Sequence, residues 1–161
     1  MAATERTIVR RATLADVEVL QSFPDADKVE ETLAAADRGE VWYAVGEVDG
    51  RVVGAAVLDL VSELQPEVKR IWIVSDHRRQ GVGSAITTWL EDKAREKGHE
   101  ATFMVIDPEN ERMISMAVDL SYSATGDHIG LENPDEVHEA AESGDPAEGL
   151  FAIYRKSLTM A

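Results

Sequence analysis

Short apolar runs alternate along the chain with segments in which apolar residues recur every three or four positions. The runs are typical of strands, and the wider spacing is typical of helices that pack on one face. The predicted strands cover residues 7–11, 41–45, 52–58, 68–74, 101–106, 123–126 and 149–155. The predicted helices cover residues 14–20, 26–38, 83–97 and 108–120.

Turn and capping residues lie at the ends of these segments. Thr13 is a suitable N-cap for the first helix, and Gly39 stops the second. Asp49-Gly50 separates two apolar runs and predicts a tight hairpin, because both central residues of a primed turn need positive φ. Gly98 ends the third helix and Pro108 starts the fourth. An early hairpin followed by strand, helix, strand and helix predicts an α+β fold, with helices on both faces of a mixed sheet.

The length of 161 residues fits one ordinary domain, which we expect to span residues 1–161. The segment 132–148 is acidic and contains no Lys or Arg. We expect it to be a solvated loop, with at most a helical turn near residues 137–141.

Charge and composition exclude several classes of protein. The chain has no cysteine, which excludes disulfides, thiolate metal sites and a cysteine nucleophile. A net charge of −15 would repel a phosphate backbone, so we expect no nucleic-acid partner. Two interpretations of the acidity stay open: a surface suited to high salt, as in a halophilic microbe, and a field that attracts cationic substrates. No segment approaches the roughly 18 apolar residues of a membrane span, so we expect a cytoplasmic protein with no membrane partner.

The segment Arg78-Arg79-Gln80-Gly81-Val82-Gly83 joins a predicted strand to a predicted helix. A helix N-terminus presents unpaired N–H groups and about half a positive charge, which suits phosphate oxygens. The two glycines let the backbone approach a ligand closely, and the two arginines add charge. Adjacent arginines beside Gly-x-Gly stand out in so acidic a chain, and we therefore predict a pyrophosphate site here.

Two other nucleotide-binding motifs fit this segment less well. A Walker loop ends in Gly-Lys-Ser or Gly-Lys-Thr, and neither tripeptide occurs in the sequence. The dinucleotide fingerprint needs a third Gly or an Ala where the helix touches the strand, and Ile86 occupies that position.

The same segment matches Arg/Gln-x-x-Gly-x-Gly/Ala, the signature of the GNAT superfamily of acyl-CoA-dependent N-acyltransferases. The order of elements resembles this family over nearly the whole chain, and the strand before the loop and the closing segment 151–158 are also similar to it. The resemblance implies a mostly antiparallel sheet of six to seven strands with helices on both faces. It also implies acetyl-CoA as the cosubstrate.

The resemblance implies that acetyl-CoA binds along the fourth predicted strand and the loop after it. The residues that it assigns to the cofactor are Ile71, Trp72 and Ile73 for pantetheine, Arg78, Arg79, Gln80, Gly81, Val82, Gly83 and Ser84 for the pyrophosphate, and Asn110 near the cofactor. An asparagine that follows a proline is as often a helix cap, so Asn110 has a structural alternative.

In this family a neutral amine attacks the thioester directly and a coenzyme A thiolate leaves. Many relatives place a tyrosine acid where this sequence has Ala117, and Tyr122 is our candidate for a displaced acid, with a core aromatic as the alternative. Glu67 is the candidate base, and the alternative is a solvent-facing charge at a strand start. His77 is expected to pack or to contact phosphate.

The function that we predict is transfer of an acetyl group from acetyl-CoA to a primary amine of a small molecule, a polyamine or a peptide. The acidic segment 132–148 favours a cationic acceptor. One alternative is a non-catalytic acetyl-CoA-binding module, because the usual tyrosine is missing, and another is a nucleotide-binding domain of a different fold. His128 and His138 lack paired ligand spacing, so we expect no metal. A homodimer stays open.

Overall fold

The computed structural model describes residues 7–24, 26–62, 64–129 and 151–159. The chain divides into two compact units, residues 1–100 and residues 101–161. Each unit is described separately below.

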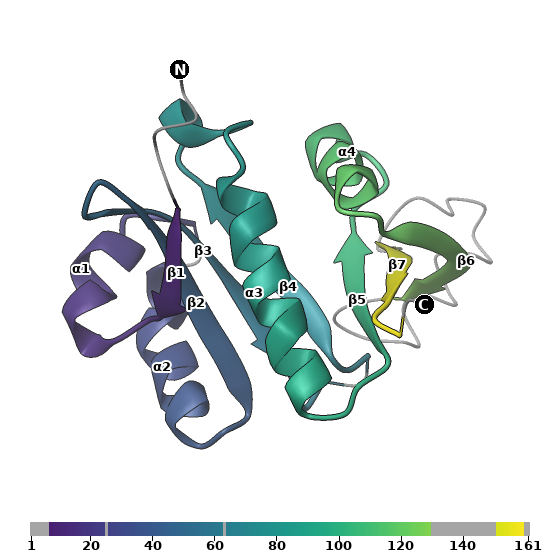
Figure 1. The fold of residues 1–161 in the computed structure, drawn as a ribbon, viewed down its shortest axis with the longest axis horizontal. Coiled ribbons are helices and arrows are strands. Elements are labelled where there is room, and N and C mark those ends of the chain that lie inside the picture. The colour runs from purple at the N-terminus through teal and green to yellow at the C-terminus, as the bar shows by residue number, and fades with distance from the viewer. Residues whose placement is uncertain (1–6, 25, 63, 130–150, 160–161) are drawn as a thin grey trace. The chain divides into compact units, whose positions relative to one another are not determined.

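The first unit contains a four-stranded antiparallel arrangement in the order β1-β2-β3-β4 (Figure 1). Its strands are β1 (Ile8–Arg11), β2 (Val41–Val48), β3 (Arg51–Asp59) and β4 (Glu67–Ile73). Its α-helices are α1 (Val17–Leu20), α2 (Val29–Asp37) and α3 (Val82–Glu96). Short 3₁₀ turns η2 (Leu14–Asp16), η3 (Ala26–Lys28) and η4 (Ser75–His77) precede the three helices.

The turn and cap residues of the first unit act as the sequence predicts. The Thr13 hydroxyl accepts the Ala15 N–H, although the helix that it caps begins as a 3₁₀ turn. Asp49 and Gly50 have φ values of 52° and 77°, the conformation that a primed hairpin turn requires. Gly39, with φ of 80°, follows the end of α2. The predicted hairpin is therefore confirmed.

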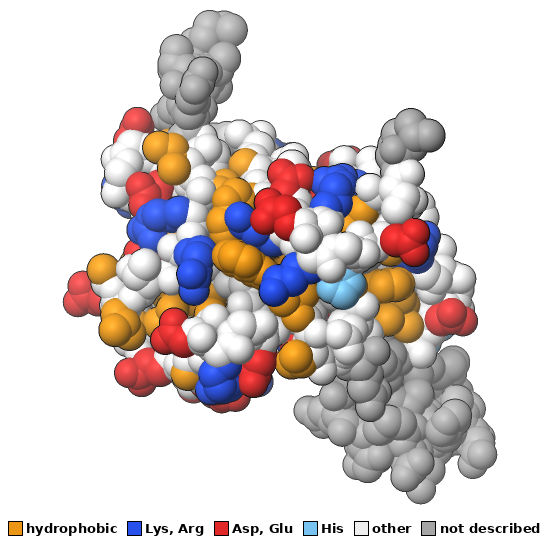
Figure 2. Space-filling view, turned by 60° about the horizontal axis from the view of Figure 1, so that its bottom comes forward, with side chains coloured by type: hydrophobic (Ala, Val, Ile, Leu, Met, Phe, Trp, Pro, Cys, Tyr) orange, Lys and Arg blue, Asp and Glu red, His pale blue; other side chains and the backbone are white. Residues whose placement is uncertain are grey.

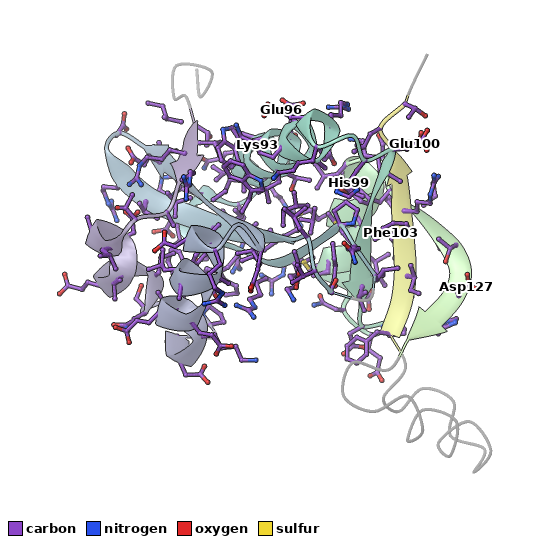
Figure 3. All side chains as sticks on the ribbon, turned by 90° about the horizontal axis from the view of Figure 1, so that it is seen from below. Lys93, Glu96, His99, Glu100, Phe103 and Asp127 are labelled. Atoms are coloured by element: carbon purple, nitrogen blue, oxygen red, sulfur yellow. The ribbon has the colours of Figure 1, made fainter. Side chains whose placement is uncertain are left out.

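Helices lie on both sides of the four strands of the first unit. In Figure 3 the purple helices α1 and α2 lie below the strands, and α3, which carries Lys93 and Glu96, lies above them. Figure 1 shows α3 from the front, where it crosses over β3 and β4. The side chains of Ile86, Leu90 and Ala94 on α3 are fully buried. This arrangement confirms the prediction of helices on both faces.

A β-bulge interrupts β4. Ala55 pairs with Trp72 and Val57 pairs with Lys69, so one residue of β3 lies opposite two residues of β4. Arg70, one of these two, has a φ of 55°. A bulge of this kind bends the strand and redirects a side chain, which is why bulges occur beside functional sites.

The second unit contains three antiparallel strands in the order β5-β7-β6. The strands are β5 (Ala101–Ile106), β6 (Ser123–Ile129) and β7 (Phe151–Ser157), and the helix is α4 (Glu111–Asp119). The prediction that Pro108 starts this helix is wrong. The Asp107 side chain accepts the Glu109 N–H at 2.9 Å, which forms a turn, and the helix begins after it.

The described residues form seven strands, and every pairing within a unit is antiparallel. The α+β class and the number of strands predicted from the sequence are thus confirmed. The single domain over residues 1–161 stays a prediction, and the predicted loop 132–148 lies outside the described residues. Within the described part of the chain, no helix has the length and apolar character needed to cross a membrane.

Candidate active site

The loop after β4 leads directly into the N-terminus of α3. Gly81 precedes the helix with φ of 89° and ψ of 1°, a left-handed conformation that glycine adopts at little cost. Ala85 donates its N–H to the Gly81 carbonyl at 2.9 Å, whereas the N–H groups of Val82, Gly83 and Ser84 have no acceptor within the helix. The first turn contains no acidic residue. These N–H groups can therefore bind an anion.

The side chains of the loop divide into two kinds. Arg78 donates from Nε to the Ile73 carbonyl at 2.8 Å, and its guanidinium lies 4.6 Å from the centre of the Trp72 ring. Gln80 donates to the Asp76 carbonyl at 3.2 Å. These two side chains hold the loop to β4 and to itself. Arg79, in contrast, is exposed and has a φ of 63°.

The sequence-predicted residues of the first unit thus lie on one continuous path. It runs from Ile71, Trp72 and Ile73 on β4 through the loop to Ser84 in the first turn of α3. His77 lies in the same loop, and its Nδ1 is buried with no hydrogen-bond partner among the described residues. The path fits a phosphate-containing ligand, because a helix N-terminus and nearby arginines both attract anions.

Three rows of paired residues lie on the face of β2, β3 and β4 that α1 and α2 cover. Directly paired residues of antiparallel strands share a face, and so do residues two apart on one strand. The rows are Val41-Asp59-Glu67, Tyr43-Val57-Lys69 and Val45-Ala55-Trp72. Charged side chains and the aromatic rings of Tyr43 and Trp72 therefore lie in neighbouring rows of this face.

Glu67, the predicted base, is buried at the start of β4, with 8% of its surface exposed. Burial raises the pKa of its carboxyl, an effect that nearby Lys69 opposes and nearby Asp59 reinforces. A carboxyl with a raised pKa is a better proton acceptor than an exposed one. The alternative, a solvent-facing charge at a strand start, is excluded by this burial.

Asp59 pairs with Glu67 on the neighbouring strand β3, and its pKa is shifted in the opposite direction. Burial opposes its charge, but an ion pair with Lys69 at 2.5 Å and the N–H groups of Val61 and Ser62 outweigh burial and lower its pKa. Asp59 is therefore a charged structural carboxylate, and Glu67 is the one of the two that can exchange a proton.

A small hollow lies on the same face, beside the bulge of β4. Its volume is about 20 Å³, and its lining includes Leu20, Phe23, Tyr43, Trp72 and Arg70. Sequence reasoning did not single out Arg70, because a strand bulge leaves no signal in a single sequence other than the residues themselves.

The second unit places the remaining predicted residues. Asn110 caps α4, and its side-chain oxygen accepts the Met113 N–H at 3.2 Å. Tyr122 is buried, with its hydroxyl 2.7 Å from the Thr102 hydroxyl. Ala117 on α4 is fully buried. Both Asn110 and Tyr122 therefore have structural roles, and a role of either in cofactor binding or catalysis stays a prediction.

Figure 2 shows one face of the molecule, on which blue basic and red acidic side chains are interspersed around apolar areas. The net charge of −15 is thus not spread as a uniformly acidic surface on this face. Within the described ranges, no group of three or more His, Cys, Asp or Glu residues could hold a metal ion.

Comparison with known proteins agrees with this geometry. The structure is similar to that of a ribosomal-protein-alanine N-acetyltransferase from Brucella melitensis, with a TM-score of 0.70, 18% identity, and 94% of this chain and 99% of that chain covered. It is similar to yncA from Salmonella typhimurium, solved with its cofactor acetyl-CoA, with a TM-score of 0.70, 16% identity, and 97% and 96% covered. It is also similar to the paia N-acetyltransferase from Thermoplasma acidophilum in complex with coenzyme A, with a TM-score of 0.72, 10% identity, and 94% and 99% covered.

At these identities the structural likenesses show the fold, and the sequence match shows the family. Residues 9–121, more than half of the chain, match the family model described as the acetyltransferase (GNAT) family. The match contains the rows of paired residues, the loop and the N-terminus of α3 described above. The resemblance that the loop motif suggests is thereby confirmed: the chain belongs to the acetyltransferase (GNAT) family, whose cosubstrate is acetyl-CoA.

Proposed function

We propose that this protein transfers an acetyl group from acetyl-CoA to a primary amine. The observation that carries the proposal is the set of N–H groups in the first turn of α3 that have no acceptor within the helix. This helix follows β4, the strand that bears the buried Glu67. A site for the pyrophosphate and a candidate base are thus both built on β4 and its connection. Acetyl-CoA or coenzyme A bound to similar proteins supports the identity of the cosubstrate.

In this proposal the N–H groups of Val82, Gly83 and Ser84 bind the pyrophosphate, and Arg79 adds positive charge beside it. Arg78 has a second role besides contact with the pyrophosphate. Its Nε is used by the Ile73 carbonyl and its plane lies on Trp72, so it holds the loop in shape and leaves its terminal nitrogens for phosphate.

Glu67 takes the role of the base. The amine nitrogen forms a bond to the acetyl carbonyl carbon, and its proton passes to Glu67, directly or through a water molecule. The carbon–sulfur bond then breaks, and its electron pair leaves on the coenzyme A thiolate. A thiol has a pKa of about 8.5, so the thiolate can leave without a dedicated acid. The proposal therefore assigns no proton transfer to Tyr122, whose hydroxyl bonds to Thr102.

Calorimetry with acetyl-CoA tests the binding site. Gly83→Glu places a carboxylate at the N-terminus of α3 and should abolish binding, whereas Gly83→Ala keeps the N–H groups and should bind within a few-fold of the native protein. Equal affinities for the native protein and Gly83→Glu would remove the site from the α3 N-terminus.

Release of free thiol from acetyl-CoA, screened across primary amines, tests the transfer. Binding of acetyl-CoA without amine-dependent thiol release would instead favour a non-catalytic acetyl-CoA-binding module, the alternative suggested by the missing tyrosine at Ala117. A cytoplasmic location, where acetyl-CoA is available, belongs to the same proposal. A homodimer stays an open prediction.

A further inference from the structure

Arg70 makes no salt bridge with a carboxylate within the described part of the chain. Its Nη1 donates to the Thr32 hydroxyl at 2.6 Å, and that hydroxyl in turn donates to the Lys28 carbonyl at 2.7 Å. These neutral partners fix the direction of the side chain without cancelling its charge. The remaining guanidinium N–H groups have no hydrogen-bond partner among the described residues and can bind a planar anion in a bidentate manner.

The backbone holds Arg70 in an unusual conformation. Its φ of 55° lies in the left-handed region, which is strained for a residue with a Cβ. The bulge at this point places Arg70 and Trp72 in the lining of the same hollow, together with side chains from β2, β3 and the segment after α1. Strain of this kind persists where the surrounding structure imposes it, and it is concentrated at ligand sites.

Apart from Arg70, the lining of the hollow is apolar or aromatic, as Leu20, Phe23, Pro24 and Trp72 illustrate. Arg70 itself is exposed, so its guanidinium acts on a ligand through direct contact at the edge of this apolar lining. An ammonium group placed against it would be repelled. A carboxylate would be attracted and held by two parallel hydrogen bonds.

Glu67 lies on the same face, two residue pairs along the strand ladder from Trp72. The charge of Arg70 also acts on the Glu67 carboxyl, so the two side chains are electrostatic neighbours. An acceptor bound between them would present its amine to Glu67 and its anionic group to Arg70.

We propose that the acceptor is a primary amine that carries a carboxylate close to its nitrogen and a small apolar side chain, as a free aliphatic amino acid does. This inference rests on the proposed function and names its substrate class. It replaces the cationic acceptor that the acidic segment 132–148 favours, a segment outside the described residues.

Matched acceptors test the inference through thiol release. Leucine, leucinamide and 3-methylbutylamine share one apolar side chain and differ in the carboxylate. The kcat/KM of leucine should exceed that of the other two by about 10- to 100-fold, the range of a charge-assisted, bidentate contact. Similar values for the three amines would overturn the inference and leave the proposed transfer intact.

Variants of Arg70 identify the group responsible. Glycine accepts a φ of 55° without strain, so Arg70→Gly should fold and should lose the preference for leucine over 3-methylbutylamine. Arg70→Lys should keep part of the preference. Arg51→Gly removes an exposed arginine elsewhere and should leave the preference unchanged. Retention of the full preference in Arg70→Gly would overturn the assignment.

A binding measurement separates this inference from the proposed function. N-acetylleucine and N-acetyl-3-methylbutylamine are titrated in calorimetry with coenzyme A present. Stronger binding of N-acetylleucine that Arg70→Gly abolishes supports the carboxylate site even where no transfer is found. Equal binding of the two compounds, or no binding of either, overturns it.

Discussion

The two faces of the four-stranded arrangement in the first unit are built from different residue types. The face that packs on α3 carries apolar residues and glycine, including Gly46, Gly54 and Ile73. The opposite face carries Glu67 and Arg70 among its apolar residues. One face therefore stabilises the unit by close packing, and the other gives up some stability to hold charged groups that can act on a ligand.

The α3 face shows how closely it is packed. A Cβ on Gly46 would lie 2.9 Å from Cδ1 of Ile86, and a Cβ on Gly54 would lie 2.6 Å from Cδ1 of Ile73. The helix can approach the strands because the strands supply glycine. In the dinucleotide fingerprint the helix supplies the small residue, and here the strands do so, which is compatible with the bulky Ile86 in the helix.

The largest expected effect is on the face that carries Glu67 and Arg70, called the reactive face below. Glu67→Gln keeps the size of the side chain and removes the proposed base, so kcat for acetyl transfer should fall by about 10²- to 10⁴-fold. Thiol release at saturating acetyl-CoA measures it, and acetyl-CoA affinity should not change. Glu96→Gln, at an exposed position on α3 (Figure 3), is the matched control. A loss below about threefold in Glu67→Gln would mean that another group accepts the proton.

The next largest effect is on stability and concerns the face that packs on α3, called the packed face below. Gly54→Val forces its side chain against Ile73, Ile86 and the Trp72 carbonyl, and we expect a loss of about 3 kcal/mol in the free energy of unfolding. Chemical denaturation measures this loss. Arg51→Val puts the same side chain at an exposed position of β3 and should change stability by less than about 0.5 kcal/mol. Equal stability of the two variants would show that the close packing at Gly54 is not required.

The packed face could be predicted from the sequence more fully than the reactive face. Periodicity predicts α3 and its buried residues Ile86, Leu90 and Ala94, because burial along a regular helix follows from spacing alone. The loop motif predicts the α3 N-terminus for a similar reason, since the backbone conformation that requires a glycine there depends only on neighbouring residues. The partner of Glu67 on β3 and the direction of Arg70 depend on strand register and on a bulge. Both arise from contacts between distant segments, which a single sequence does not display.

Glu67 also predicts a pH effect on stability. Its pKa is raised by burial in the folded chain, so the folded state binds a proton more tightly than the unfolded state. Its contribution to stability is therefore greatest below the ordinary carboxyl pKa and is lost as pH rises through the raised value. Glu67→Gln should then be more stable than the native protein at pH 7, and this difference should vanish as pH falls below about 4, the ordinary range of a glutamate.

Thermal denaturation of the two proteins as a function of pH measures this difference. Asp59, whose pKa is lowered, is present in both proteins, so most of its own loss of stability at low pH cancels in the comparison. A native protein that is more stable than Glu67→Gln at pH 7 would contradict the prediction, and would show that attraction to Lys69 and Arg70 exceeds the cost of burial.

The smallest effect should come from Arg79, whose φ of 63° is strained for any residue with a Cβ. Arg79→Gly relieves this strain but adds flexibility to the unfolded chain, and the net gain in stability should be about 0.5–1 kcal/mol. The same change removes an exposed charge next to the α3 N-terminus. Affinity for acetyl-CoA should fall by up to about fivefold, as for a solvent-exposed ion pair.

Arg79→Lys separates the two effects, because it keeps both the charge and the strained φ. It should resemble the native protein in stability and retain most of the affinity for acetyl-CoA. Calorimetry and denaturation of the same three samples provide both readouts. If Arg79→Gly were less stable than the native protein, the loop would depend on contacts of the Arg79 side chain. If its affinity were unchanged, Arg79 would lie outside the pyrophosphate site, and binding at this loop would rest on the backbone N–H groups of α3 and on Arg78.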